Sequence, residues 1–178
     1  MTDRAVRPLL FLDVDGTLLP YRGARLPSTP QGWEDCQDVS NPQLANIDVG
    51  HGPRLLALPC DLMWATAWME DANEVIAPPL GLPALPVTDL PDLPQKYEAD
   101  TLNWKTRALV RAAAGHPFIW VDDSITDIDH ARVSTHHREH ALLQRVDSMI
   151  GLTDTDFAVI DDWLLEPIQH PWRTQRRD

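Results

Sequence analysis

The stretch Pro8–Leu18, PLLFLDVDGTL, decides the fold of this chain. Its apolar start, Pro8–Leu12, is short and ends at a turn signal, which predicts a buried strand. Asp13 and Asp15 follow directly, and Gly16 permits a sharp turn after them. Because side chains alternate along an extended chain, the two carboxylates are expected on the same side. Acidic groups beside a buried run are costly unless the protein uses them, so this strand end is a candidate functional site.

Apolar runs and amphipathic segments alternate along the rest of the chain. Further strands are expected at Asp61–Ala65, Leu85–Val87, Pro117–Val121 and Ala141–Val146. Helices are expected at Pro53–Leu58, Trp68–Ile76, Leu102–Ala114, Ser124–His136 and Thr153–Leu165. Pro78–Pro79 should end the second helix, and Thr153 with Asp156 forms a capping-box-like start for the last. This alternation predicts an α/β fold with a mostly parallel sheet covered on both faces.

In such a sheet the active site forms at the carboxyl ends of the strands. Thr66 follows the second apolar run, and its hydroxyl, with backbone N–H groups such as that of Ala67, can hold a phosphate oxygen. Lys105 lies near the start of a predicted helix and is one of two lysines in the chain. The other lysine, Lys96, and the nearby Arg107 are alternatives for the same role.

Carboxylates also follow the strand predicted at Pro117–Val121. Asp122 and Asp123 come directly after it, and Asp127 lies one helical turn further on. A carboxylate can attack an electrophile while a neighbouring one moves a proton. Several carboxylate oxygens close together also suit a hard cation such as Mg²⁺. Helix capping is the alternative role for these aspartates.

The order of these groups resembles the haloacid dehalogenase (HAD) superfamily of phosphohydrolases. The four family motifs match Asp13–Thr17, Thr66, Lys105 and Val121–Asp123, in that order along the chain. The resemblance covers roughly residues 8–165, and it implies a Rossmann-like three-layer sandwich. An acid at Asp15 is typical of the phosphatases and phosphomutases of the superfamily, so the resemblance implies phosphoryl chemistry.

The resemblance also implies a role for each matching residue. Asp13 is expected to attack phosphorus and form an aspartyl-phosphate. Asp15 is expected to protonate the leaving group and then to deprotonate water. The phosphoryl oxygens are expected to be held by residues of the first three motifs, namely Gly16, Thr66, Ala67 and Lys105.

Mg²⁺ is the cofactor that the resemblance implies. Its expected ligands are the Asp13 carboxylate, the Asp15 backbone carbonyl and Asp122. Asp123 and Asp127 are expected as outer or supporting ligands.

The chain is expected to form one domain, 1–178, with a core at about 8–165 and a C-terminal tail at about 167–178. The two insertions, Leu18–Gly52 and Pro78–Ala99, are short and rich in proline or glycine, so neither can hold a full cap. Leu18–Gly52 is expected to form a flap over the site. A phosphomutase needs a cap to exclude water, so the short insertions favour hydrolysis. A non-catalytic binding module with the same fold is the third hypothesis.

A phosphorylated small molecule is the expected substrate, and a nucleic-acid end is the alternative. The opening Phe11–Tyr21 and the segment Leu142–Leu165 resemble a bacterial HAD group associated with RNA-repair proteins. The net charge of -12 does not support non-specific nucleic-acid binding. No apolar run is long enough for a membrane span, and a cytoplasmic location is expected. Trp33 and Trp68 are candidates to stack on a substrate ring, although packing is the favoured role.

Overall fold

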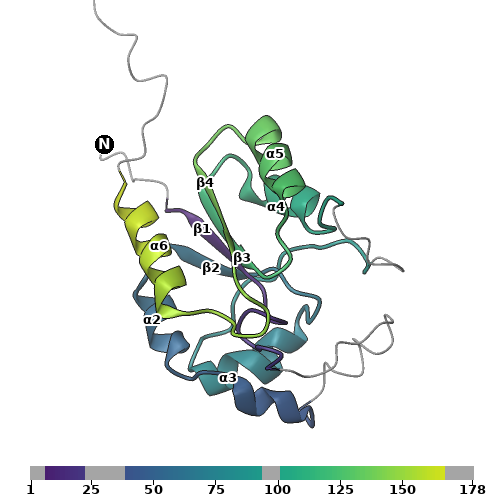
Figure 1. Ribbon diagram of the computed structural model, residues 1–178, viewed down its shortest axis with the longest axis vertical. Coiled ribbons are helices and arrows are strands. Elements are labelled where there is room, and N and C mark those ends of the chain that lie inside the picture. Colours follow the sequence, from purple (N-terminus) through teal and green to yellow (C-terminus); the bar gives the residue numbers. More distant parts are fainter. Residues whose placement is uncertain (1–6, 23–38, 94–100, 167–178) are drawn as a thin grey trace, which may run out of the picture.

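The computed structural model describes residues 7–22, 39–93 and 101–166. Its centre is a four-stranded, all-parallel sheet with the order β2-β1-β3-β4 (Figure 1). The strands are β1 (Leu9–Leu12), β2 (Asp61–Trp64), β3 (Phe118–Asp122) and β4 (Ala141–Arg145). Leu9 pairs with Asp61 on one side and with Phe118 on the other, so β1 lies between β2 and β3. The predicted α/β fold with a parallel sheet is confirmed.

Helices cover both faces of this sheet, which makes three layers. One face carries α4 (Thr106–Ala113) and α5 (Asp127–His136). The other face carries α2 (His51–Ala57), α3 (Ala77–Leu80) and α6 (Asp154–Leu165). Successive side chains of β1 point to opposite faces of the sheet, so this strand contributes to a hydrophobic core on each face.

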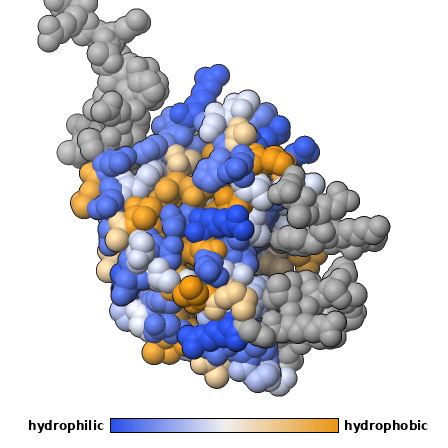
Figure 2. Space-filling view, viewed as in Figure 1, coloured by the Kyte–Doolittle hydropathy of each residue, from blue (hydrophilic) through white to orange (hydrophobic). Residues whose placement is uncertain are grey.

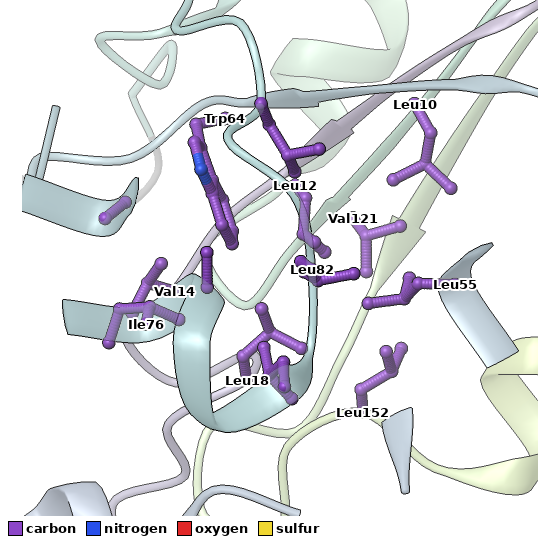
Figure 3. Packing of buried hydrophobic residues seen from close by; sticks show 14 of the residues in the cluster. Leu10, Leu12, Val14, Leu18, Leu55, Trp64, Ile76, Leu82, Val121 and Leu152 are labelled. Carbon is purple, nitrogen blue, oxygen red and sulfur yellow. The ribbon is translucent and has the colours of Figure 1, made fainter. Parts of the chain in front are cut away.

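The two hydrophobic cores are built from alternating residues of the same strands. Leu10 and Leu12 of β1 lie in a cluster with Leu55 of α2 (Figure 3). Phe11, between them, lies in the opposite cluster with Leu109 of α4. All five side chains are almost completely removed from solvent. At about 1.5–3 kcal/mol for each large apolar side chain buried, such contacts dominate the stability of the sheet and fix the positions of its strand ends.

Two of the expected elements differ in the structure, and a proline explains the first of these differences. Leu85–Val87 is not a strand, because it is paired with β2 only through an isolated bridge between Val87 and Trp64. Pro86, inside this segment, has no N–H to donate to a ladder. The predicted helix Trp68–Ile76 is shorter at its start, since its regular part is the π-helix η2 (Ala72–Ile76).

The sequence predicts that this helix ends at Pro78–Pro79, and this prediction is wrong. η2 runs directly into α3, which holds both prolines in its first turn. A proline is tolerated there because the N–H groups of a first turn have no partner within the helix. α3 ends instead at Gly81, which has a φ of 67°.

Two helices begin with the same reciprocal cap. At α6 the Thr153 and Asp156 side chains each accept a hydrogen bond from the other's backbone, which confirms the predicted capping box. At α5 Thr126 and Asp129 form the same motif, so that helix begins at Asp127 rather than at Ser124. α4 likewise starts at Thr106, after Lys105, and not at Leu102.

The described part of the Leu18–Gly52 segment contains a short 3-10 helix, η1 (Pro42–Asn46). The middle of this segment, with Trp33, lies outside the described residues, as do Lys96 and the tail 167–178. Hydrophilic residues cover most of the face of the molecule seen in Figure 2. Among the described helices, none combines the length and apolar character that a membrane crossing requires.

Candidate active site

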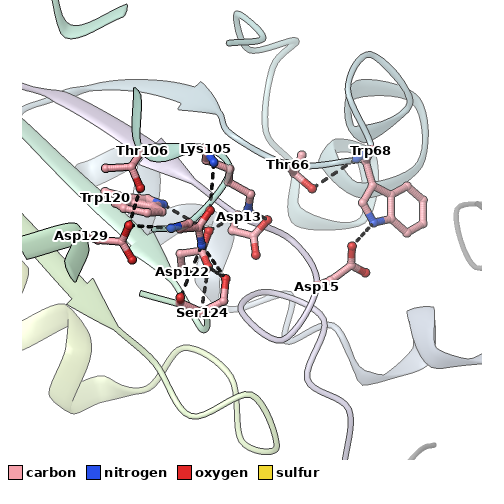
Figure 4. A network of polar contacts seen from close by, with 11 residues as sticks. Asp13, Asp15, Thr66, Trp68, Lys105, Thr106, Trp120, Asp122, Ser124 and Asp129 are labelled. Atoms are coloured by element: carbon pink, nitrogen blue, oxygen red, sulfur yellow. Dashed lines mark hydrogen bonds and ion pairs between the residues drawn. The ribbon is translucent and has the colours of Figure 1, made fainter. Parts of the chain in front are cut away.

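A buried lysine joins the carboxyl ends of β1 and β3. The N–H of Asp13 donates to the Val121 carbonyl at 3.1 Å, which holds the two strand ends together. Lys105, just before α4, places its Nζ 2.7 Å from Asp13 Oδ1 and 2.7 Å from Asp122 Oδ2 (Figure 4). All three side chains are at least 94% removed from solvent. The structure therefore brings three of the predicted site residues into direct contact.

Asp122 is held rigidly by its own strand and by the turn after it. The indole Nε1 of Trp120 donates to Asp122 Oδ2 at 3.2 Å. The backbone N–H and the hydroxyl of Ser124 both donate to Oδ1, at 2.9 and 2.6 Å. A buried carboxylate that accepts this many hydrogen bonds keeps one orientation.

Asn103 connects the lysine to the loop that follows β3. Its Oδ1 accepts the backbone N–H of Lys105 at 2.9 Å, and its Nδ2 donates to Ser124 Oγ at 2.9 Å. Its own N–H donates to the fully buried Asp129 at 2.8 Å. The hydroxyl of Thr106 also donates to Asp129. Neither Asn103 nor Asp129 was among the residues expected from the sequence.

Three carboxylates form a compact group that suits a metal ion. Asp13, Asp122 and Asp123 each offer an oxygen, and these atoms all lie within 4.8 Å of one another. Carboxylate oxygens are the ligands that hard divalent cations prefer. The acidic triad therefore fits a cation such as Mg²⁺. Asp127, by contrast, lies exposed in the first turn of α5 and is not part of this group.

Gly16 makes room for the third of these carboxylates. A Cβ at this position would lie 2.2 Å from Asp123 Oδ2, far inside contact distance. Its φ of 71° is also one that side chains with a Cβ rarely adopt. Glycine is thus required here both for the turn after β1 and for the position of Asp123.

Asp15 and Thr66 lie beside Trp68, just past β2. Trp68 Nε1 donates to Asp15 Oδ2 at 3.0 Å, and its backbone N–H donates to Thr66 Oγ1 at 3.3 Å. In the view of Figure 4, Asp13 lies between this group and Asp122. Thr66 is completely buried, and Ala67 is partly exposed. Trp68 is only 1% exposed, so its ring packs in the core and is not free to stack on a substrate.

Burial controls the charges of these groups. It raises the pKa of Asp13 well above its ordinary value, and the neighbouring Asp122 adds to that shift despite the opposing Lys105. Burial likewise raises the pKa of Asp15 to about 6 and that of Asp123 to about 7. Burial works against the charge of Lys105, yet Asp122 and Asp13 raise its pKa above the ordinary value. Lys105 therefore stays cationic while Asp15 and Asp123 exchange protons near neutral pH.

Residues 9–157 match the family described as the HAD domain in Swiss Army Knife RNA repair proteins. The chain belongs to this HAD family. The match spans the residues from β1 into α6 and includes the acidic triad. A search of curated proteins found no match.

Proposed function

We propose that this HAD domain is a magnesium-dependent phosphohydrolase that forms an aspartyl-phosphate on Asp13. One observation carries the proposal: Asp13 is buried at a strand end, with Oδ1 bound to Lys105 and with Asp122 and Asp123 close by. The proposed nucleophile, a fixed cation and a candidate metal site therefore lie within a few ångströms of one another. That combination suits phosphoryl transfer, in which positioning and charge stabilisation do most of the catalysis.

In the proposed reaction Asp13 attacks phosphorus through Oδ2, because Lys105 holds Oδ1. Lys105, the Thr66 hydroxyl and the backbone N–H of Ala67 hold the phosphoryl oxygens. The N–H of Gly16 already donates to the Leu19 carbonyl at 2.9 Å, so we assign it no phosphate contact. Asp15 donates a proton to the leaving oxygen and then takes one from the attacking water. Its raised pKa of about 6 leaves part of the population protonated near neutral pH, as the first step needs.

Asp13 and Asp122, with the backbone carbonyl of Asp15, are the residues that we propose hold Mg²⁺. Asp123 supports them, and we assign this role to it rather than to the exposed Asp127. When bound, the ion supplies positive charge that offsets the charge on the phosphoryl oxygens.

Mg²⁺ binding is expected to strengthen as the pH rises through about 7. The metal requires ionised carboxylates, whereas the raised pKa values of Asp13 and Asp123 keep protons in the metal-free cluster. At a pH below these pKa values, protons compete with Mg²⁺ for the carboxylates. At a pH above them, the carboxylates are ionised and bind the ion without this competition. Isothermal titration at pH 6, 7 and 8 should show affinity rising by up to about tenfold per pH unit, with proton release. Equal affinity at pH 6 and pH 8 would contradict this.

The substrate that we propose is a terminal phosphate of RNA. The family description refers to RNA repair proteins, which favours a nucleic-acid end over the small molecule expected from the sequence. Neither insertion is long enough for a full cap, which favours a substrate that presents the end of a long chain. A strongly acidic protein needs a local cation to hold such a substrate.

We propose that Arg145 supplies that cation at the rim of the site. It ends β4 in register with Asp122, and its Nε donates to the Asp123 carbonyl at 3.1 Å. Its side chain is exposed, unlike that of Lys105. We propose that it contacts the phosphodiester next to the terminal phosphate.

Arg145→Gln is expected to raise the KM for a phosphorylated oligoribonucleotide about five- to tenfold, without changing that for 4-nitrophenyl phosphate. The loss of one phosphate contact should also lower the salt dependence of log KM by about 0.7. Steady-state kinetics at several salt concentrations measure both effects. Arg111→Gln is the matched control, because this exposed arginine lies in the last turn of α4, away from the carboxyl edge. Equal effects of the two variants would mean that Arg145 does not contact the substrate.

The function itself is tested by phosphate release from a panel of substrates. The panel holds RNA with a 5′- or a 3′-phosphate, mononucleotides, sugar phosphates and 4-nitrophenyl phosphate, each with and without Mg²⁺. Mg²⁺-dependent release that is fastest from an RNA end supports the proposal. Release from small molecules alone would mean that the substrate is a phosphorylated small molecule, as expected from the sequence. Transfer to an acceptor other than water would indicate a phosphotransferase, and no reaction on any substrate would favour a non-catalytic HAD domain.

A further inference from the structure

One buried tryptophan connects two of the proposed catalytic groups. Trp68 donates through its indole Nε1 to Asp15 Oδ2 at 3.0 Å and through its backbone N–H to Thr66 Oγ1 at 3.3 Å (Figure 4). It is 1% exposed and lies in the same hydrophobic cluster as Leu12 and Val14, the residues on either side of Asp13. The indole is therefore fixed by packing relative to the nucleophile strand.

Packing alone does not require this hydrogen bond. A buried indole N–H needs an acceptor, and a neutral oxygen can serve. Trp64 is an example of an indole with no role in the site, since its Nε1 donates to Asn73 Oδ1 at 2.8 Å. In Trp68 the acceptor is instead the carboxylate two residues after the proposed nucleophile. Charge-assisted bonds of this kind hold a side chain more firmly than neutral ones.

We infer that Trp68 is a positioning residue that makes Oδ1 of Asp15 the proton-carrying oxygen. This inference rests on the proposed function. The indole N–H is a donor only, so it must meet an oxygen that accepts. It meets Oδ2. Because the carbonyl oxygen of a protonated carboxyl is the better acceptor, this bond favours a proton on Oδ1. The bond also stops the carboxyl group from rotating, so that Oδ1 keeps one direction.

The proton then follows a single path through both half-reactions. In the first, the bond from Asp13 to phosphorus forms, the ester P–O bond breaks, and the Oδ1 proton of Asp15 passes to the leaving oxygen. In the second, the oxygen of water bonds to phosphorus, the P–O bond to Asp13 breaks, and one water proton returns to Oδ1. Asp15 ends as it began, and Oδ2 remains bound to Trp68 throughout.

Trp68→Phe tests this role, because it keeps an aromatic ring in the core and removes the N–H donor, together with part of the ring volume. The test compares two esters, a ribose-terminal phosphate whose leaving alkoxide needs a proton, and 4-nitrophenyl phosphate, whose leaving group does not. The variant is expected to lower kcat for the ribose ester about ten- to a hundredfold, which is part of the effect of a general acid. The rate with 4-nitrophenyl phosphate should change by less than about threefold. Asp15→Asn should show the same selectivity, and adding Trp68→Phe to it should cause no further selective loss.

Trp64→Phe is the matched control, because it removes an equally buried indole N–H whose partner, Asn73, is outside the site. Any change in rate with this variant should be the same for both esters. Equal losses for both esters in Trp68→Phe, or no loss, would overturn the inference while the proposed function stands. Failure of the wild-type protein to hydrolyse either ester would overturn the proposed function and this inference together.

Discussion

Replacing Asp13 with asparagine is expected to abolish phosphate release without weakening the fold. Asparagine cannot form the aspartyl-phosphate, and the loss of a covalent nucleophile typically lowers kcat by about 10⁴-fold or more. The fold should survive because burial already disfavours the ionised form of Asp13, as its raised pKa indicates. A neutral side chain of the same shape removes that penalty. Phosphate release and urea unfolding, measured on the same preparation, check both parts.

A control for Asp13→Asn is available at the opposite edge of the sheet. Asp61→Asn, at the start of β2, changes an exposed aspartate that pairs with Arg7. It should leave kcat unchanged and shift the free energy of unfolding by less than about 0.5 kcal/mol. If Asp13→Asn retained turnover at the wild-type rate, the nucleophile would be another residue. If it lost both activity and stability, its inactivity would not report on the chemistry.

Replacing Lys105 with methionine is expected to have the largest effect on stability. Methionine matches the length of the side chain but leaves the carboxylates of Asp13 and Asp122 buried without their shared cation. Removing one partner of such a buried ionic group typically costs about 3–5 kcal/mol. The free energy of unfolding at pH 7, from urea titration, measures this cost. Activity should be lost as well, because Lys105 is the proposed partner of the phosphoryl oxygens.

The pH dependence of the stability loss in Lys105→Met identifies the cause of that loss. Without the opposing charge of Lys105, the pKa of Asp13 rises further above its value in the unfolded chain. Carboxyls with raised pKa values favour the folded state at low pH, and that advantage is lost as the pH rises through the folded pKa. The deficit of Lys105→Met relative to the wild type should therefore shrink as the pH falls from 7 towards about 5. It should also shrink in the Asp13→Asn background, which holds one buried carboxylate fewer.

Arg107→Met provides the comparison for Lys105→Met. Arg107 belongs to the same helix, α4, but its side chain is exposed. Its loss should cost less than about 0.5 kcal/mol and should show no such pH dependence. Equal costs for the two variants would mean that the bridge from Lys105 to Asp13 and Asp122 contributes nothing to the stability.

The order of elements was predictable because each strand is a short apolar run next to a turn signal. The positions of β1, β2, β3 and β4 follow that pattern within a residue or two. The segment Leu85–Val87 has the same apolar character but forms no ladder, because a proline interrupts it and it has only Trp64 to pair with. The prediction that Pro78–Pro79 end a helix is wrong because a proline is equally compatible with the first turn of a helix.

The supporting residues of the site were harder to predict than the motif residues. Asp129 joins the Asn103 backbone, the Thr106 hydroxyl and the cap of α5, so it connects the lysine loop to the Asp122 loop. Its pattern with Thr126, a threonine followed three residues later by an aspartate, was visible, yet that pattern indicates only a helix start. The contacts of Asp129 with Asn103 and Thr106 depend on the packing of α4 against α5, which a sequence pattern does not specify.

Trp68 shows the same limit in another way. The sequence offered packing or ring stacking for this residue, and the structure favours packing because the ring is buried. The additional hydrogen bond to Asp15 spans 53 residues of sequence. It follows from the register of β1 on β2, which brings the turn after each strand to the same edge. A local pattern at either residue contains no sign of it.

Trapping the phosphoenzyme tests the central claim most directly. The wild-type protein is mixed with an RNA oligonucleotide carrying a ³²P-labelled terminal phosphate in the presence of Mg²⁺, quenched with acid during turnover and digested to peptides. The account predicts a hydroxylamine-sensitive label on the peptide that contains Asp13, absent without Mg²⁺ and absent in Asp13→Asn. Release of labelled phosphate with no protein-bound label, at an undiminished rate in Asp13→Asn, would contradict it.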